Sequence, residues 1–266
     1  MSEPNNPPLI VAHRGASALA PENTLAAFRR ALRDGAEGLE FDVRLARGDE
    51  VVVFHDATLE RLANRKERVS DLTVEELRTV DVGSWFGRLR KNAANAEDFS
   101  AERIPTLAEL LDFLRDFEGL IYIEMKCGEA DCERLARAVC ETIEGGPRLS
   151  QMIVKSFQLE ALAHVKRFLP EVRTAALFAP KIMTILRKEK RLVRLAHETG
   201  ADMLSVHFSL ATRKLMKKAA KRNLPVTIWT ADHPRWVKRA AKLGLFAVIT
   251  NDPARLLARR AELSGK

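Results

Sequence analysis

Three carboxylates interrupt short, strongly apolar runs of this sequence. Glu40 and Asp42 lie two residues apart in GLEFDV, so an extended strand would point both side chains to the same face. Glu124 lies in LIYIEM, and Lys126 follows two positions later on that same face. Carboxylates that share an interior repel one another unless a cation lies between them, and oxygen ligands favour Mg²⁺ or Ca²⁺ over zinc. The spacing therefore indicates a site for a divalent cation, with a solvent-facing acidic strand as the alternative.

Two histidines and an arginine stand at the ends of similar apolar runs. His13 closes LIVAH and is followed by Arg14, and His55 closes VVVFH. Histidine exchanges protons near neutrality, and the cations Arg14 and Lys126 suit a phosphate group. The alternative for each histidine is a hydrogen-bonded structural role. If these runs are parallel strands of one sheet, their ends meet at one edge and all these side chains share one site with the carboxylates.

The elements that must position these residues alternate between β-rich runs and helical stretches. Such alternation predicts a parallel sheet with right-handed crossovers. The run VVVFH follows GLEFDV after the short turn RGDE, which indicates a hairpin extension of the second strand and leaves eight strands. Eight units in this length favour a closed TIM (β/α)8 barrel, with a doubly wound open sheet as the alternative. The predicted strands are residues 9–13, 38–43 with the extension 51–55, 120–125, 152–157, 174–179, 202–207, 225–230 and 247–250.

One connection is too long for a simple loop. Residues 56–118 separate the second strand from the third and include the capped helical segment DLTVEELRTV. A long insertion that follows a barrel strand lies at the catalytic, C-terminal face. We therefore predict one barrel domain at residues 9–257, with an insertion or cap at 56–118.

The positive charge of the chain is unevenly distributed. The net charge is +8, and residues 181–266 hold 20 Lys and Arg against 6 Asp and Glu. This excess indicates either an anionic partner, such as weak contact with an anionic membrane surface, or simply the solvated faces of outer helices. Charge alone is a weak indication of nucleic-acid binding, and no recognised nucleic-acid motif accompanies it.

The cysteine pattern and the N-terminus bear on location. The three cysteines show no CxxC spacing, and Cys127 is expected to be a buried free thiol. No apolar run reaches 18 residues, and the first residues lack the features of a secretory signal. These observations predict a reduced, cytoplasmic setting.

The stretch at residues 12–62, with its HR and HD elements on either side of an ExD, resembles the signature segment of glycerophosphodiester phosphodiesterases. The segments IPTLAELLDFL, IYIEMK, SF at Ser156, IWT and ITNDP are also similar, so the resemblance spans about residues 9–257. It implies a TIM barrel with an insertion after the second strand. The implied residues are Glu40, Asp42 and Glu124 for the metal, His13 and His55 for catalysis, Arg14 and Lys126 for phosphate, and Asn23, in PENT, as a residue that braces or touches the site.

The resemblance implies metal-dependent hydrolysis of a glycerophosphodiester to an alcohol and sn-glycerol 3-phosphate. By analogy His13 is the nucleophile or base and His55 is the proton donor, with attack either by water or by a substrate hydroxyl that forms a cyclic phosphate. Trp229 lies near the end of the seventh strand, where it either packs on the substrate or belongs to the core. The segments LERLANRKERVSD and TADHP depart from the family pattern, so the alcohol group stays open.

Two other functions are compatible with these residues. The first is a lysophospholipase D-like phosphodiesterase acting on lysophospholipids, which the basic C-terminal part favours. The second is a non-catalytic barrel that binds a phosphometabolite. The pair His13 and His55 argues against the second, because a binding protein has no need of two proton-transfer groups.

Overall fold

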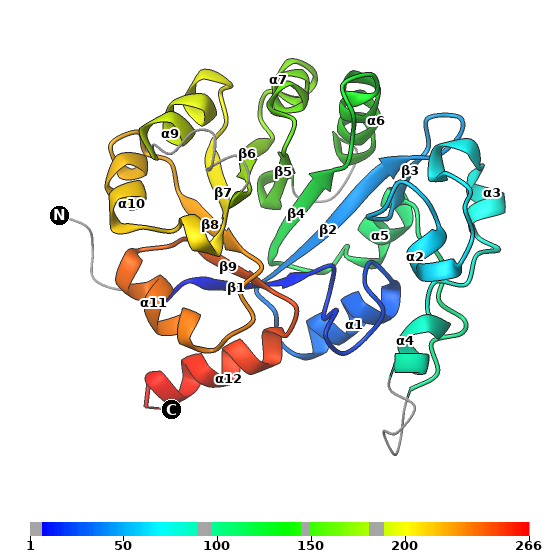
Figure 1. Cartoon of the computed structure of the whole chain (residues 1–266), viewed down its shortest axis with the longest axis horizontal. Helices are drawn as coiled ribbons and strands as arrows, with labels where there is room; N and C mark the ends of the chain where they lie inside the picture. Colours follow the sequence, from blue (N-terminus) through cyan, green and yellow to red (C-terminus); the bar gives the residue numbers. More distant parts are fainter. Residues whose placement is uncertain (1–6, 90–96, 145–148, 181–188, 266) are drawn as a thin grey trace.

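Eight parallel strands close into a barrel in the computed structural model, which describes residues 7–89, 97–144, 149–180 and 189–265. The barrel is closed because β1 pairs with both β2 and β9 (Figure 1). The predicted TIM barrel is therefore confirmed, and the open sheet is excluded. Its strands are β1 (Leu9–His13), β2 (Gly38–Leu45), β4 (Leu120–Met125), β5 (Met152–Ser156), β6 (Arg173–Phe178), β7 (Met203–His207), β8 (Val226–Trp229) and β9 (Ala247–Thr250).

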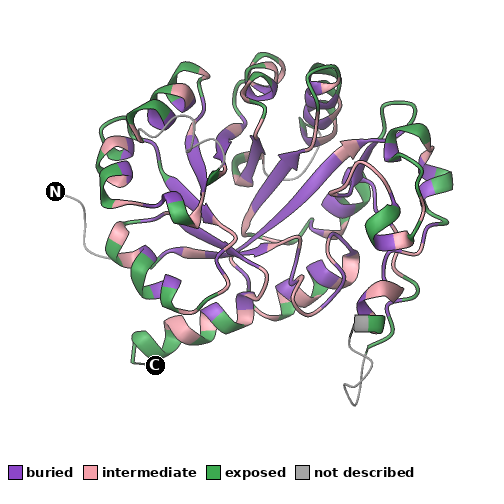
Figure 2. Cartoon of the chain, in the orientation of Figure 1, coloured by how far each residue is buried: buried purple, intermediate pink, exposed green. Residues whose placement is uncertain are grey.

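Amphipathic helices surround the barrel and cover the outer side of the sheet. Several begin at a polar cap: the hydroxyl of Thr24 accepts a hydrogen bond from the backbone of Ala27, and Thr106 forms a capping box with Glu109. Figure 2 shows that the strands are largely buried and that exposed residues gather on the outward sides of the helices. The surrounding helices are α1 (Leu25–Arg33), α5 (Leu107–Phe113), α6 (Cys132–Glu144), α7 (Leu159–Phe168), α9 (Glu189–Glu198), α10 (Arg213–Ala220), α11 (Arg235–Leu243) and α12 (Pro253–Leu263).

The predicted hairpin extension of the second strand is present. The short strand β3 (Val51–Val53) pairs antiparallel with the end of β2, so that Val43 faces Val53. The free side of β3 meets the chain as it returns from the insertion: the backbone N–H of Val53 donates to the carbonyl of Pro105 at 2.8 Å. The hairpin therefore joins the barrel to both ends of the insertion.

The insertion has helices and a core of its own. Its elements are α2 (Glu60–Ala63), a 3-10 turn (Val69–Asp71), α3 (Val74–Leu77) and α4 (Ser84–Leu89), which lie to one side of the barrel in Figure 1. Phe54, Leu59 and Leu77 belong to the main cluster of this core. By contrast, Leu107 and Leu110 of α5 pack in the cluster between barrel and helices. Within the range 56–118, α5 is thus one of the helices that cover the barrel.

Side chains alternate along the strands between the outer face, which packs against the helices, and the barrel interior, which is polar at one end only. On β2, Leu39, Phe41 and Val43 pack against the helices, which leaves Glu40 and Asp42 pointing into the barrel. The other end of the interior is filled by apolar side chains from several strands, namely Val11, Tyr122, Ile153, Ala175, Met203, Ala247 and Ile249. The polar layer consequently lies toward the C-terminal ends of the strands, where barrel enzymes have their active sites.

Candidate active site

The three predicted carboxylates form one buried cluster at the C-terminal ends of β2 and β4. Asp42 and Glu124 are register partners on adjacent strands, and Glu40 lies one position further down the same face of β2. All three residues are at most 5% exposed. One carboxylate oxygen from each lies within 4.8 Å of the others. Three ionisable oxygen ligands this close together could hold a hard divalent cation.

Two lysines approach these carboxylates from the neighbouring strands. Lys155 of β5 is the register partner of Glu124, and its Nζ lies 2.6 Å from Glu40 Oε1 and 3.2 Å from Glu124 Oε2. Lys126, just after β4, places its Nζ 3.1 Å from Asp42 Oδ1 and forms an ion pair with Glu124. The cluster is therefore an alternating group of buried charges of opposite sign.

These cations keep Glu40 and Asp42 ionised. Burial acts to raise the pKa of Asp42, but Lys126 and Arg14 outweigh it and hold this pKa far below its usual range. Burial likewise opposes ionisation of Glu40, and Lys155 reverses the effect so that the pKa falls. A carboxylate must be deprotonated to bind a metal ion. Glu40 and Asp42 are thus already in the protonation state that a cation requires.

The loop between β1 and α1 brings Arg14 to the carboxylates through an unusual backbone path. Arg14 has a φ of 55° and Gly15 a φ of 76°, both in the left-handed region. A Cβ atom on Gly15 would lie 2.6 Å from the backbone of Ala27, so only glycine allows the loop to pass this close to α1. The turn directs Arg14 Nε to within 2.9 Å of Asp42 Oδ2. Strained backbone of this kind is concentrated at functional sites.

Asn23, at the other end of this loop, holds Asp42 at two points. Its Nδ2 donates to Asp42 Oδ2 at 3.0 Å, and its Oδ1 accepts from the backbone N–H of Asp42 at 3.3 Å. Asn23 has a φ of 58° and is 3% exposed. The residue therefore braces one of the carboxylates.

An asparagine orients His13 through the ring nitrogen Nδ1. Its Nδ1 lies 2.7 Å from Asn251 Oδ1. Asn251 Nδ2 donates to Asp232 Oδ2 at 2.8 Å, which identifies Oδ1 as the acceptor for the histidine. In the neutral form of His13 this contact places the proton on Nδ1 and the lone pair on Nε2, which lies 3.9 Å from Glu40 Oε2.

His55 is oriented in the same way by its neighbour in sequence. Its Nδ1 lies 2.7 Å from Asp56 Oδ1, a carboxylate that can only accept, so Nδ1 carries the proton and Nε2 is the free nitrogen. Burial lowers the pKa of His55, and the cations Lys126 and Arg14 lower it further, while Asp42 acts in the opposite direction. Burial would raise the pKa of Asp56, but hydrogen bonds from His55 and Arg61 outweigh it.

Aromatic side chains lie beside Lys126 at the ends of β5, β7 and β8. The ring of Trp229 packs edge-on against Phe157 and against His207, each at 5.5 Å between centroids. Lys126 Nζ lies 5.9 Å from the centroid of Phe157. The indole nitrogen of Trp229 is buried and has no hydrogen-bond acceptor among the described residues. Phe157 thus joins Trp229 to the charged cluster.

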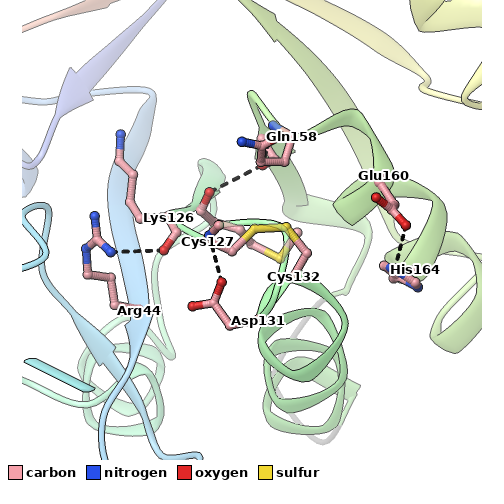
Figure 3. The surroundings of a disulfide bond; sticks show 11 residues. Arg44, Lys126, Cys127, Asp131, Cys132, Gln158, Glu160 and His164 are labelled. Carbon is pink, nitrogen blue, oxygen red and sulfur yellow. Dashed lines mark hydrogen bonds and ion pairs between the residues drawn. A yellow bond between two sulfur atoms is a disulfide. The ribbon is translucent and has the colours of Figure 1, made fainter. Parts of the chain in front are cut away.

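The predicted free thiol of Cys127 is wrong. Cys127 is half-buried and forms a disulfide with Cys132, with 5.1 Å between the two Cα atoms (Figure 3). The chain turns back after β4 because the backbone N–H of Gly128 bonds to the carboxylate of Asp131 at 2.7 Å, so α6 begins beside the strand end that it follows. Cys140 is the buried free cysteine of the described chain.

Several residues around the site were not predicted from the sequence. Lys155 is the one that the sequence could most easily have predicted. A lysine within the apolar run MIVKSF is as conspicuous as the acidic residues within GLEFDV. Asp56, Asn251 and Asp232 orient the two histidines but lie in polar segments, where their types are ordinary. Arg61 lies in the polar segment LERLANRKERVSD of the insertion, where nothing distinguishes it from the other charged residues.

Comparison with known proteins shows the class of enzyme to which this barrel and its charged cluster belong. The chain matches the model of the glycerophosphoryl diester phosphodiesterase family over residues 13–255 and belongs to that family. A glycerophosphodiester phosphodiesterase of Caldanaerobacter subterraneus subsp. tengcongensis is 31% identical over 249 residues, which are 94% of this chain and 96% of that protein. Another, from Bacillus altitudinis, is 28% identical over 96% of this chain and 98% of its own length.

A solved structure shows the same fold. A phosphodiesterase of Oleispira antarctica, in complex with the product sn-glycerol-3-phosphate, has a TM-score of 0.81 at 24% identity and covers 95% of this chain and 96% of its own. Together with the family match, these findings make the protein an enzyme of the glycerophosphodiester phosphodiesterase class.

Proposed function

We propose that this protein hydrolyses glycerophosphodiesters to an alcohol and sn-glycerol 3-phosphate with a divalent cation, Mg²⁺ or Ca²⁺, as its cofactor. The observation that carries the proposal is the buried cluster of Glu40, Asp42 and Glu124, whose oxygens lie within 4.8 Å of one another. Family membership supports the substrate class, as does the product bound in the Oleispira antarctica relative.

Glu40, Asp42 and Glu124 would hold the cation. When bound, it would neutralise charge on the phosphoryl oxygens and act as a Lewis acid at the phosphorus centre. Arg14 and Lys126 are assigned to the remaining phosphoryl oxygens. Their side chains are 16% and 15% exposed and already point at the carboxylates, so they are held in place before substrate arrives.

The two histidines are assigned to proton transfer on opposite sides of the phosphorus. His13, through Nε2, would take a proton from the attacking water or substrate hydroxyl, or would itself bond to phosphorus, in which case water would then break the nitrogen–phosphorus bond and release sn-glycerol 3-phosphate. His55, when protonated at Nε2, would donate that proton to the oxygen of the departing alcohol as its bond to phosphorus breaks. An alkoxide of high pKa leaves poorly without such a proton, which is why a second histidine is needed.

Asn23 and Trp229 are assigned supporting roles. The two hydrogen bonds from Asn23 would keep Asp42 in the orientation that the cation requires. The indole N–H of Trp229, which has no acceptor within the described part of the chain, supports its placement against the glycerol or alcohol part of the substrate, where an oxygen could accept the bond. We also propose that the insertion within 56–118 covers the site and helps to select the alcohol.

A panel of glycerophosphodiesters and lysophospholipids, assayed with Mg²⁺, Ca²⁺ and chelator, tests the proposal. The expected result is metal-dependent release of sn-glycerol 3-phosphate from a glycerophosphodiester. Release of a lysophosphatidate or cyclic phosphate from lysophospholipids would instead identify the lysophospholipase D-like activity. Tight binding of a phosphometabolite without turnover would identify a binding protein and contradict hydrolysis.

The basic outer helices are the observation that favours contact with lipids. Helices α10 and α11 carry four Lys or Arg residues each and no acidic residue. We include weak contact with an anionic membrane surface in the proposal for this reason. In the described part of the chain, no helix is both long enough and apolar enough to cross a membrane.

The compartment stays a prediction. The prediction of a cytoplasmic location rests partly on the absence of a pairing pattern among the cysteines in the sequence. The bond between Cys127 and Cys132 removes that support, since disulfides persist mainly in oxidising compartments.

A further inference from the structure

Arg61, in the first turn of the insertion helix α2, forms ion pairs with two carboxylates at once. Its Nε lies 2.5 Å from Asp56 Oδ2, its Nη1 lies 3.0 Å from Glu22 Oε2, and its Nη2 lies 2.6 Å from Glu22 Oε1. The contact with Glu22 is bidentate through Nη1 and Nη2. The contact with Asp56 uses the remaining nitrogen of the guanidinium, Nε. A guanidinium that meets two carboxylates in this way fixes their relative position.

Each of these carboxylates also accepts a hydrogen bond from a residue of the site, Asp56 from His55 and Glu22 from Arg14. The other oxygen of Asp56 accepts from His55 Nδ1 at 2.7 Å. Glu22 Oε1 also accepts from Arg14 Nη1 at 2.8 Å, so Glu22 is held on the barrel side. Arg61 therefore lies between a residue anchored to the barrel and the residue that orients His55.

We propose that Arg61 is a positioning residue for His55, acting through Asp56 and anchored on Glu22. The side chain of Arg61 is 44% exposed, against 24% for Asp56 and 12% for Glu22. When Arg61 is removed, Glu22 keeps Arg14 as a partner and Asp56 keeps His55, so neither carboxylate is left without a hydrogen-bond donor. Removal of Arg61 should leave the fold intact while freeing the Asp56 carboxylate to rotate, so that His55 loses a fixed direction.

The kinetic consequence rests on the proposed function, in which His55 protonates the leaving alcohol. A misdirected proton donor should slow the departure of an alkyl alcohol. It should have little effect on the departure of p-nitrophenol, which leaves without a proton. We expect R61M to lower kcat by about 10- to 100-fold with an alkyl glycerophosphodiester and only a few-fold with a p-nitrophenyl phosphodiester. R61K should recover part of the loss, because a lysine reaches one carboxylate but cannot bridge both.

A double-mutant cycle identifies the route of the effect. If Arg61 acts through Asp56, the R61M substitution should lower kcat for the alkyl glycerophosphodiester by less than about 3-fold when it is added to D56N. The matched control is R65M: Arg65 belongs to the same insertion, is 37% exposed and pairs only with the exposed Glu67 among the described residues. R65M should behave as wild type with both substrates, and thermal melts should show that all variants fold.

A measurement without substrate separates this inference from the proposed function. The Nδ1 proton of His55, bonded to Asp56, should give a downfield NMR resonance that H55A removes. R61M should broaden or abolish it, while R65M keeps it. An unchanged resonance in R61M, or equal losses on both leaving groups, would overturn the role of Arg61. Wild-type inactivity on every diester would defeat the proposed function, and the NMR result would still decide the inference.

Discussion

The ammonium nitrogen of Lys155 lies 2.6 Å from Glu40 Oε1, and both side chains are at most 1% exposed. Burial acts to lower the pKa of Lys155, but Glu40 and Glu124 outweigh it and raise that pKa above its usual value. A cation that is part of the protein therefore already compensates the carboxylates that would bind a metal ion. For the proposed metal site, this arrangement predicts that the stability of the protein and its response to metal are interdependent.

The first prediction concerns this lysine. K155M leaves Glu40 and Glu124 facing each other without their shared cation, so in chelator the free energy of unfolding should fall by about 3–5 kcal/mol. Saturating Mg²⁺ or Ca²⁺ should restore more stability to K155M than it adds to wild type, since the metal ion replaces the missing charge. Thermal unfolding with and without metal measures both effects. K214M, which removes an exposed lysine paired with Glu189 at 3.4 Å, is the control. An equal metal response in both variants would contradict the prediction.

The second prediction separates the side chain of Asn23 from its backbone conformation. N23G keeps a residue that tolerates the φ of 58° but loses both hydrogen bonds to Asp42. Metal affinity should fall by about 10- to 100-fold, the usual effect of removing a group that orients a ligand. N23A should lose the same affinity and additionally about 1 kcal/mol of stability from backbone strain. Isothermal titration and thermal melts check the two effects. Wild-type affinity in N23G would show that Asn23 does not brace the site.

The third prediction concerns the two histidines. H13A and H55A should each lower turnover of an alkyl glycerophosphodiester by roughly 10²-fold or more. With a p-nitrophenyl leaving group, H55A should recover much of the lost rate and H13A should not, because only the proton donor becomes dispensable. H164A is the control, since His164 lies on α7 with a 3.9 Å contact to Glu160. Recovery by H13A instead would reverse the two assignments.

The fourth prediction concerns the disulfide. As isolated under oxidising conditions, the unfolded protein should show one free thiol, that of Cys140, and reduction should expose three. C127S/C132S should be less stable by about 2 kcal/mol, as expected for a short closed loop. Thiol titration and thermal melts make these measurements. Three free thiols without reductant would mean that the bond does not form in solution.

The fifth prediction concerns the basic helices. If α10 contacts an anionic surface, the protein should co-sediment with phosphatidylserine vesicles at low salt, and K217E/K218E/K221E should abolish this. A purely solvated face predicts no binding in either case. If the charge only steers soluble anionic substrates, kcat/KM should fall with ionic strength while vesicles have no effect.

The barrel and the central charges were predictable because both depend on local patterns. Alternation of strands and helices predicts the parallel sheet, and charged residues such as Glu40 and Glu124 are conspicuous in apolar strands. Lys155 carried the same signal, and the predicted strand order places it beside β4, but the residue types did not show that its ammonium group pairs with both Glu40 and Glu124. The partner of His55 is its sequence neighbour Asp56, whereas the partner of His13 comes from a distant segment, since Asn251 is 238 residues away. The pairing of His13 with Asn251 follows from barrel closure, which residue types alone do not specify.

The disulfide illustrates a different limit. Cys127 and Cys132 are five residues apart, and a spacing of this kind pairs only if the chain reverses between them. That reversal depends on the cap that Asp131 provides to Gly128, a detail of loop geometry rather than composition.

The meeting of the two ends of the insertion at β3 has a consequence for how such a protein can diverge. The chain leaves the hairpin after Val53 and returns at Pro105, whose carbonyl bonds to Val53. Because the departure and return points adjoin, segments between them can lengthen, shorten or be exchanged for little more than the entropy of closing a different loop, without altering the strand register. Two parts of the insertion contact the segments that carry site residues: His55 to Arg61, and Phe86 with Phe99, which pack against Ala20 and Ala27. New substrate preferences could therefore arise by exchanging the segments between these two contacts while the catalytic layer stays unchanged.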